Sequence, residues 1–153
     1  MNNYKTVFFA IGILLIILGA FMFMPFIVQL IFDEKNSTFI SSASITIFIG
    51  ILLVLANSEE DRKLNLQQAF LLTVLSWLSI AIFGCLPFMF SDLSLSFIDS
   101  FFESMSGITT TGSTIISNLD NAPKGILLWR AILQWLGGIG IIVMAITILP
   151  LLN

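Results

Sequence analysis

Hydroxyl side chains and glycines gather near the middle of the chain, in the stretch GITTTGST (Gly107 to Thr114). Two glycines five positions apart are a feature of nucleotide-binding loops, but such a loop requires a lysine directly after the second glycine. Here Ser113 follows Gly112, so the cation that would hold a triphosphate is missing. The stretch instead offers backbone carbonyls and threonine hydroxyls, neutral hard oxygens that suit an alkali cation stripped of its water. A dehydrated monovalent cation is therefore the predicted ligand, and the alternative is a polar turn that caps a helix hairpin.

A short helix is predicted directly before this loop, over Ser96–Gly107. At 1.5 Å per residue it would be about 16 Å long, which is half the thickness of a bilayer core. Ser96 is expected to cap its start and Gly107 to end it. Its carboxyl end carries about half a negative charge, which attracts cations. The residues predicted for its apolar face are Phe97, Phe101, Phe102 and Met105, and those for its polar face are Asp99 and Glu103.

The composition of the chain places this loop in a membrane. Of 153 residues, 58% are hydrophobic and only 10% are charged, and the mean hydropathy is +1.06. A soluble core cannot hold so many apolar side chains. The net charge of −3 comes without a basic cluster, which argues against a nucleic-acid partner. Histidine is absent, Cys85 is the single cysteine, and no serine has a histidine or lysine beside it at membrane depth, so we predict no enzymatic activity and no cofactor.

Four apolar runs are long enough for helices that cross about 30 Å of hydrocarbon, which takes about 20 residues. We expect the first to be a retained span rather than a cleaved signal peptide, because it is too long and no small-residue cleavage site follows it. Pro25 is expected to bend this span, and Gly12 and Gly19 to let a neighbouring helix approach closely. The expected spans are residues 7–32, 39–56, 69–90 and 126–152.

Polar residues within and between these runs carry further expectations. In the fourth run, Arg130 is expected to extend toward the outer interface, and the glycines of GGIG (Gly137–Gly140) to allow close packing or a hinge. Arg62 and Lys63 mark the polar loop 57–68 as cytoplasmic, which places the amino terminus on the same side. The hydroxyls expected to bond the carbonyls of their own helix are those of Ser41, Ser42, Ser44 and Thr46.

The predicted fold is an all-α membrane protein with four transmembrane helices, plus one re-entrant half-helix and filter loop between the third and the fourth. Each unpaired backbone group in hydrocarbon costs several kcal/mol, so irregular backbone at membrane depth is stable only where protein buries it or water lines it. The loop Gly107–Thr114 must therefore face a watery pathway or a bound ion.

The order of helix, short helix, loop and helix, together with the residues from Phe101 to Pro150, resembles the first repeat of the Trk/Ktr/HKT potassium transporter superfamily, TrkH/TrkG type. The stretch reads FFESMSGITTTGSTIISNLDNAPKGILLWRAILQWLGGIGIIVMAITILP. Two helices before the repeat match the same type, so the resemblance covers essentially the whole chain. The residues that align with T-V-G of the potassium-channel filter T-V-G-Y-G are Thr110, Thr111 and Gly112, and Ser113 takes the place of the tyrosine.

The resemblance implies potassium ion uptake across the plasma membrane, with potassium as the transported ligand. Backbone oxygens of Thr109 to Gly112 would then form one quarter of the ion cage. Asp99 and Glu103 are expected to bond backbone groups or neighbouring repeats near the outer mouth, and the alternative for Glu103 is that its charge shapes the local potential. The implied filter residues are Thr109, Thr110, Thr111, Gly112 and Ser113, with potassium at Thr110, Thr111 and Gly112.

The resemblance also implies how the chain is organised. Residues 1–57 would form an N-terminal transmembrane hairpin and residues 58–153 the first helix–pore loop–helix repeat, in a multi-pass protein of the bacterial inner membrane. Family members carry four repeats in one chain, so we expect this chain to be a truncated transporter. Its implied partners are membrane lipid, the three remaining repeats and a cytoplasmic nucleotide-binding regulatory subunit. The alternatives are a homotetrameric cation channel and a non-conducting membrane scaffold subunit.

Overall fold

The computed structural model describes residues 4–34, 37–58 and 65–148, with side chains as far as Ile142. Within these ranges every assigned regular element is a helix, in agreement with the predicted all-α fold. The helices are α1 (Lys5–Phe21), α2 (Phe23–Ile31), α3 (Ser37–Ala56), α4 (Leu66–Gly84), α5 (Leu86–Phe90), α6 (Phe97–Ile108), the 3-10 helix η1 (Leu119–Asn121) and α7 (Lys124–Ile148).

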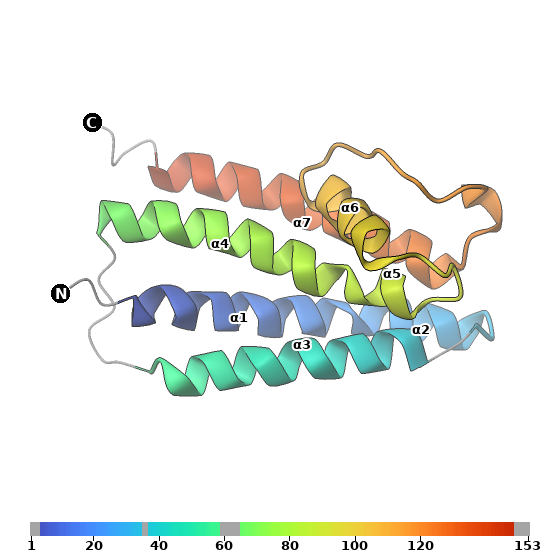
Figure 1. Cartoon of the computed structure of the whole chain (residues 1–153), viewed down its shortest axis with the longest axis horizontal. Coiled ribbons are helices and arrows are strands. Elements are labelled where there is room, and N and C mark those ends of the chain that lie inside the picture. The colour runs from blue at the N-terminus through green and yellow to red at the C-terminus, as the bar shows by residue number, and fades with distance from the viewer. Residues whose placement is uncertain (1–3, 35–36, 59–64, 149–153) are drawn as a thin grey trace.

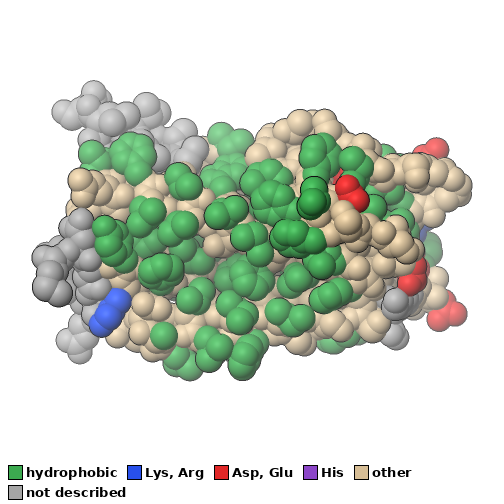
Figure 2. All heavy atoms as spheres, in the orientation of Figure 1, with side chains coloured by type: hydrophobic (Ala, Val, Ile, Leu, Met, Phe, Trp, Pro, Cys, Tyr) green, Lys and Arg blue, Asp and Glu red, His purple; other side chains and the backbone are tan. Residues whose placement is uncertain are grey.

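Four helical stretches are long and apolar enough to cross a membrane, as the sequence predicts. They run alongside one another, and α6 lies beside α7 toward one end of the bundle (Figure 1). Hydrophobic side chains cover the face seen in Figure 2, and the few charged side chains in view lie toward its two ends. An apolar belt of this kind matches the hydrocarbon core of a bilayer. The four stretches are Lys5–Ile31, Ser37–Ala56, Leu66–Phe90 and Lys124–Ile142; residues 149–152 of the last predicted span lie outside the described residues.

Prolines interrupt two of these stretches. Pro25 has no N–H to offer to the carbonyl of Phe21, and its ring crowds that carbonyl, so the helix is broken between them. The break lies at Met22, where α1 gives way to α2, three residues before the proline at which the bend was predicted. Pro87 has the same effect on the third stretch, where Cys85 separates α4 from α5.

The helices α1 and α3 are in backbone contact. A Cβ atom at Gly12 would lie 2.8 Å from the carbonyl oxygen of Gly50, and a Cβ atom at Gly50 would lie 2.8 Å from that of Gly12. Small residues at such a crossing are a common way for membrane helices to associate, so the prediction for Gly12 is confirmed. The predicted bonds to the carbonyl four residues earlier, each 2.8 Å long, are made by Ser42, Ser44 and Thr46.

Aromatic contacts join α1 and α3 to α7. The ring of Phe39 on α3 packs edge-on against Trp129, with centroids 6.1 Å apart. Phe21, the last residue of α1, makes a similar contact with Trp135 at 5.9 Å. Such ring pairs contribute about 0.5–1.5 kcal/mol beyond the area they bury. The hairpin predicted at residues 1–57 is therefore packed against the last helix of the predicted repeat, while the boundary at residue 57 stays a prediction.

Candidate ion-binding loop

The helix before the loop, α6, begins as the sequence predicts. The hydroxyl of Ser96 accepts a hydrogen bond from the backbone N–H of Asp99 at 3.1 Å and donates one to its Oδ2 atom at 2.7 Å. Ser96 is thus the N-cap, and Asp99 places a negative charge in the first turn, where the helix dipole favours it. With 12 residues, α6 is about 18 Å long, too short to cross a bilayer. Its re-entrant course through a membrane stays a prediction.

The end of α6 differs from the prediction that Gly107 terminates it. The helix continues to Ile108, and the left-handed residue that closes it is Thr110, with φ +60°. The N–H of Thr110 donates to the carbonyl of Gly107 at 2.9 Å, and the N–H of Thr111 donates to that of Ser106 at 3.0 Å. This is the double hydrogen-bond pattern that usually closes on a glycine. A β-branched residue in this conformation is an outlier of the kind that collects at functional sites.

Gly107 instead serves the packing between α6 and α7. A Cβ atom at this position would lie 3.1 Å from the Cβ of Leu133, closer than side chains normally approach. Gly107 and Leu133 are both buried. The glycine is therefore explained by the neighbouring helix rather than by the end of its own.

The loop after α6 turns back along the helix. Thr109 donates from its hydroxyl to the carbonyl of Met105 at 2.8 Å, and its Oγ1 lies 2.9 Å from that of Thr111. Gly112 has φ +77°, a conformation that glycine adopts without steric cost. The hydroxyl of Ser106 then donates to the carbonyl of Ser113 at 2.6 Å, which ties the returning chain to the helix.

The backbone carbonyls of the predicted filter differ in their partners. Among the described residues, no hydrogen bond is accepted by the carbonyls of Thr109 to Gly112, whereas that of Ser113 accepts one from Ser106. Residues 109–113 are all exposed in this chain. The loop thus contains four consecutive exposed residues whose carbonyl oxygens have no hydrogen-bond partner among the described residues. Whether these residues hold potassium stays a prediction.

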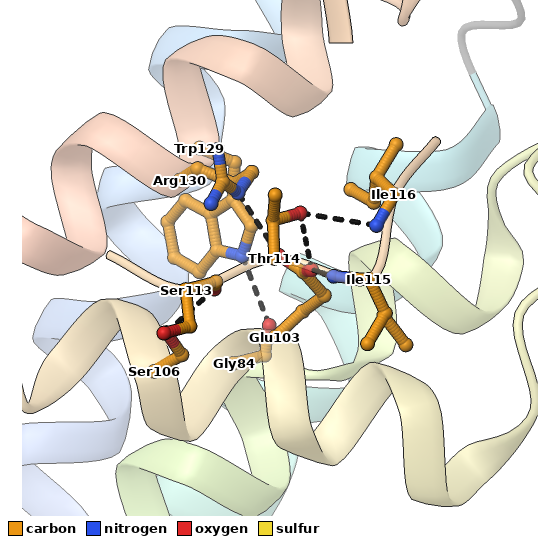
Figure 3. Close-up of polar contacts among 9 residues, drawn as sticks. All are labelled: Gly84, Glu103, Ser106, Ser113, Thr114, Ile115, Ile116, Trp129 and Arg130. Carbon is orange, nitrogen blue, oxygen red and sulfur yellow. Dashed lines mark hydrogen bonds and ion pairs between the residues drawn. The ribbon is translucent and has the colours of Figure 1, made fainter. Parts of the chain in front are cut away.

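A buried carboxylate holds the far end of the loop (Figure 3). Glu103 is 1% exposed, and its Oε1 accepts hydrogen bonds from the Thr114 hydroxyl at 2.5 Å and from the Ile115 N–H at 2.6 Å. Its Oε2 accepts from Nε of Arg130 on α7 at 2.9 Å. The Thr114 hydroxyl also accepts from the N–H of Ile116 at 3.0 Å. A single side chain of α6 therefore joins both the returning chain and the next helix.

This arrangement corrects two predictions. Arg130 does not extend toward an outer interface, because its side chain is only 14% exposed and points to Glu103. Asp99 and Glu103 do not share a polar surface, because Asp99 stays at the partly exposed helix start while Glu103 is buried. Burying the charge of Glu103 or of Arg130 alone would cost several kcal/mol, so these two opposite charges are buried together as an ion pair.

The helix α7 closes the site from the other side. The indole Nε1 of Trp129 donates to the carbonyl of Gly84 at 2.9 Å, at the end of α4 (Figure 3). A Cβ atom at Gly137 would overlap the carbonyl oxygen of Ile108, so the end of α6 rests on the backbone of α7. The close packing predicted for the glycines of residues 137–140 is confirmed at Gly137. A Cβ atom at Gly138 would have open space around it.

Sequence reasoning missed the partnership between Glu103 and Arg130. The signal that points to it is the rarity of charge in an apolar run, since an arginine at membrane depth requires a partner. Within the described part of the chain, no group of three or more histidine, cysteine or acidic side chains is placed to hold a metal ion. The oxygens on offer in the loop itself are neutral.

Comparison with known proteins shows that this chain is similar to transport proteins. The family model TrkH, described as a cation transport protein, matches residues 35–153. The Trk system potassium uptake protein TrkH of Escherichia coli K12 is 40% identical over an alignment of 153 positions that covers 99% of this chain and 32% of that protein. The Trk system potassium uptake protein TrkI of Halomonas elongata is 38% identical over an alignment of 154 positions that covers 100% of this chain and 31% of that protein.

A solved structure shows the same arrangement. The crystal structure of the potassium transporter TrkH from Vibrio parahaemolyticus superimposes with a TM-score of 0.90 at 36% identity. The match covers 98% of this chain and 32% of that one. The chain thus spans about a third of the length of the relatives it matches.

Proposed function

Because this chain belongs to the TrkH family of cation transport proteins, we propose that it takes part in potassium ion uptake and supplies one of four pore loops. It is a multi-pass membrane protein, and we place it in the bacterial inner membrane with a cytoplasmic amino terminus. Its role is transport, and we assign it no enzymatic reaction. Potassium is the transported ion, and no cofactor takes part.

The observation that carries this proposal is the set of four consecutive carbonyls from Thr109 to Gly112, which belong to exposed residues and accept no hydrogen bond from the described residues. A potassium ion that leaves water needs carbonyl oxygens in place of its hydration shell. The proposed filter comprises residues 109–113, with potassium at Thr110, Thr111 and Gly112. Within it, Ser113 contributes least through its carbonyl, because that oxygen already accepts a bond from Ser106.

The elements around the loop support the same role. The carboxyl end of α6 carries partial negative charge, and it lies directly before the loop, where it attracts a cation. Glu103 is neutralised by Arg130, so its main effect is to hold Thr114 and Ile115 in place rather than to shape the local potential. The proposed ion ligands are thereby fixed at both ends of the loop.

One loop supplies only one side of an ion cage, and a filter needs a ring of carbonyls. We therefore propose that residues 58–153 act as one repeat beside three others of the same kind, and that residues 1–57 form a preceding hairpin. A cytoplasmic nucleotide-binding subunit is the proposed regulator, by the resemblance to the Trk type.

The test is a substitution in the loop with a matched glycine as control. In cells that depend on the gene for this chain, Gly112→Asp is expected to abolish rubidium uptake, because it places a charged side chain in the filter where φ is +77°. Gly138→Ala is the control, since a Cβ at that position meets nothing within 4 Å. Normal uptake by Gly112→Asp, at normal abundance in the membrane, would rule out the pore and favour a scaffold.

A further inference from the structure

The carboxylate of Glu34, in the turn after α2, lies against the first residues of α7. Its Oε1 accepts a hydrogen bond from the N–H of Lys124 at 2.6 Å, and its Oε2 accepts one from the N–H of Gly125 at 3.1 Å. The first N–H groups of a helix have no partner within the helix, and negative charge is favourable beside them. Glu34 therefore caps a helix that begins 90 residues later in the chain.

The residues that directly precede α7 in the sequence have no side chain that could cap it. Pro123 accepts the first helical hydrogen bond, from the N–H of Leu127 at 3.0 Å, but its side chain has no acceptor. Ala122 before it has none either. The usual capping residues are serine, threonine, aspartate and asparagine at the helix start itself, so the sequence around residue 123 does not point to the residue that caps this helix.

The backbone of Glu34 is itself held by the end of α2. Its N–H donates to the carbonyl of Gln29 at 2.9 Å, while Asp33 between them has φ +52°. This is the pattern that closes a helix on a left-handed residue. Glu34 thus ends one helix with its backbone and caps another with its side chain, so the ends of α2 and α7 are fixed relative to each other.

Close packing continues along the first turns of α7. A Cβ atom at Gly125 would lie 2.7 Å from Cγ of Gln29 and 3.2 Å from Cε2 of Phe39. Gln29 is 3% exposed and Phe39 is fully buried. The start of α7 is therefore seated against both α2 and α3 and has little freedom to slide along its own axis.

From this fixed start, α7 reaches the ion-binding loop within two turns. Arg130 lies five residues after Gly125, a rise of about 7.5 Å along the helix. Arg130 pairs with Glu103, which in turn holds the backbone of Ile115. We propose that Glu34 is a positioning residue of the loop: by capping α7 it sets the height at which Arg130 meets Glu103. This inference rests on the proposed function of the loop, and it gives α2 and α3 a role in building the filter.

Hydrogen exchange of backbone amides in the purified protein tests this directly, with Glu34→Ala, Glu34→Gln and, as control, Asp120→Asn. Asp120 is acidic and exposed, and it lines the same pocket as Glu34 and Lys124. For Glu34→Ala we expect exchange about tenfold faster at Lys124 and Gly125, which corresponds to ~1.4 kcal/mol. We expect faster exchange at Ile115 as well, and a smaller effect for Glu34→Gln, which keeps an acceptor oxygen. The control is expected to leave all three amides unchanged.

Two results would overturn the inference. Faster exchange at Lys124 and Gly125 with no change at Ile115 would mean that the cap does not reach the loop. If the amides throughout α3 exchange faster by the same factor, the substitution has caused a general loss of stability. If Glu34→Ala does not fold, Glu34→Gln is used for the same comparison. The ratio of rubidium to potassium uptake is the second readout, because positioning of the filter shifts it while reduced abundance does not. If the wild type transports no potassium, the proposed function fails, whereas the exchange result still decides on the cap.

Discussion

The carboxylate of Glu103 on α6 meets the guanidinium of Arg130 on α7, with Oε2 and Nε 2.9 Å apart and the glutamate side chain fully buried. Both helices and the returning loop converge on this pair, since the other carboxylate oxygen accepts from Thr114 and Ile115. A buried pair of this kind adds little stability compared with apolar packing, but the loss of one partner leaves the other uncompensated. The pair therefore determines the shape of the loop more than it determines how stable the bundle is.

Glu103→Gln is expected to lower the free energy of unfolding by about 3–5 kcal/mol and to abolish rubidium uptake, because Arg130 is left buried without a counter-charge. Thermal unfolding of the purified protein and uptake in cells measure the two effects. Asp99→Asn is the control on the same helix, since Asp99 is partly exposed and bonds only at the helix start.

A double-substitution cycle separates pairing from the other contacts of Glu103. The double variant with Glu103→Gln and Arg130→Gln is expected to unfold at a higher temperature than the sum of the two single effects predicts. In the double variant neither charge is left buried without its partner. Strictly additive effects would contradict a direct energetic link between the two side chains.

Thr110→Gly is expected to leave thermal stability unchanged or slightly raised, yet to weaken the preference for potassium over sodium. Thr110 has φ +60°, a conformation that costs about 1–3 kcal/mol for a residue other than glycine. Glycine removes that strain, but it also lets the loop change shape, so the carbonyls are held less firmly. Competition of sodium with rubidium uptake reports the preference.

Thr111→Gly is the matched control for this change, because Thr111 has no positive φ and its hydroxyl lies 2.9 Å from that of Thr109. We expect it to lower stability by about 1 kcal/mol, through the added freedom of the unfolded chain and the lost contact. Equal destabilisation by the two variants would show that Thr110 is not strained.

Gly137→Ala is expected to lower the free energy of unfolding by about 1–3 kcal/mol or more, because the added methyl group would overlap the carbonyl oxygen of Ile108. The end of α6 would have to move away from α7, and the loop with it. Gly138→Ala adds the same methyl group where there is open space, and it is expected to be neutral or stabilising. Thermal unfolding of the two variants is the measurement. Equal unfolding temperatures would contradict the close contact between Gly137 and Ile108.

Much of the fold could be predicted because its rules are local. A run of uncharged residues gives a spanning helix by its length alone, and a serine three residues before Asp99 gives the cap of α6. The composition of residues 109–113 gives a loop rich in neutral oxygens by the same kind of reasoning. The expected helix end at Gly107 was wrong because glycine has two uses, and the sequence alone does not tell a helix end from a close helix contact.

By itself, then, the sequence determined the class of the protein, its four apolar spans, and a short capped helix leading into a loop of hydroxyls and carbonyls. Only the tertiary structure decided that Glu103 would turn inward to Arg130, that Glu34 would cap α7 and that Thr110 would carry the left-handed turn. The physical reason is range: hydrophobic length and capping by a neighbouring residue act between near neighbours, whereas the carboxylates of Glu103 and Glu34 are placed by partners that lie 27 and 90 residues away. Those partners meet only once the helices have packed.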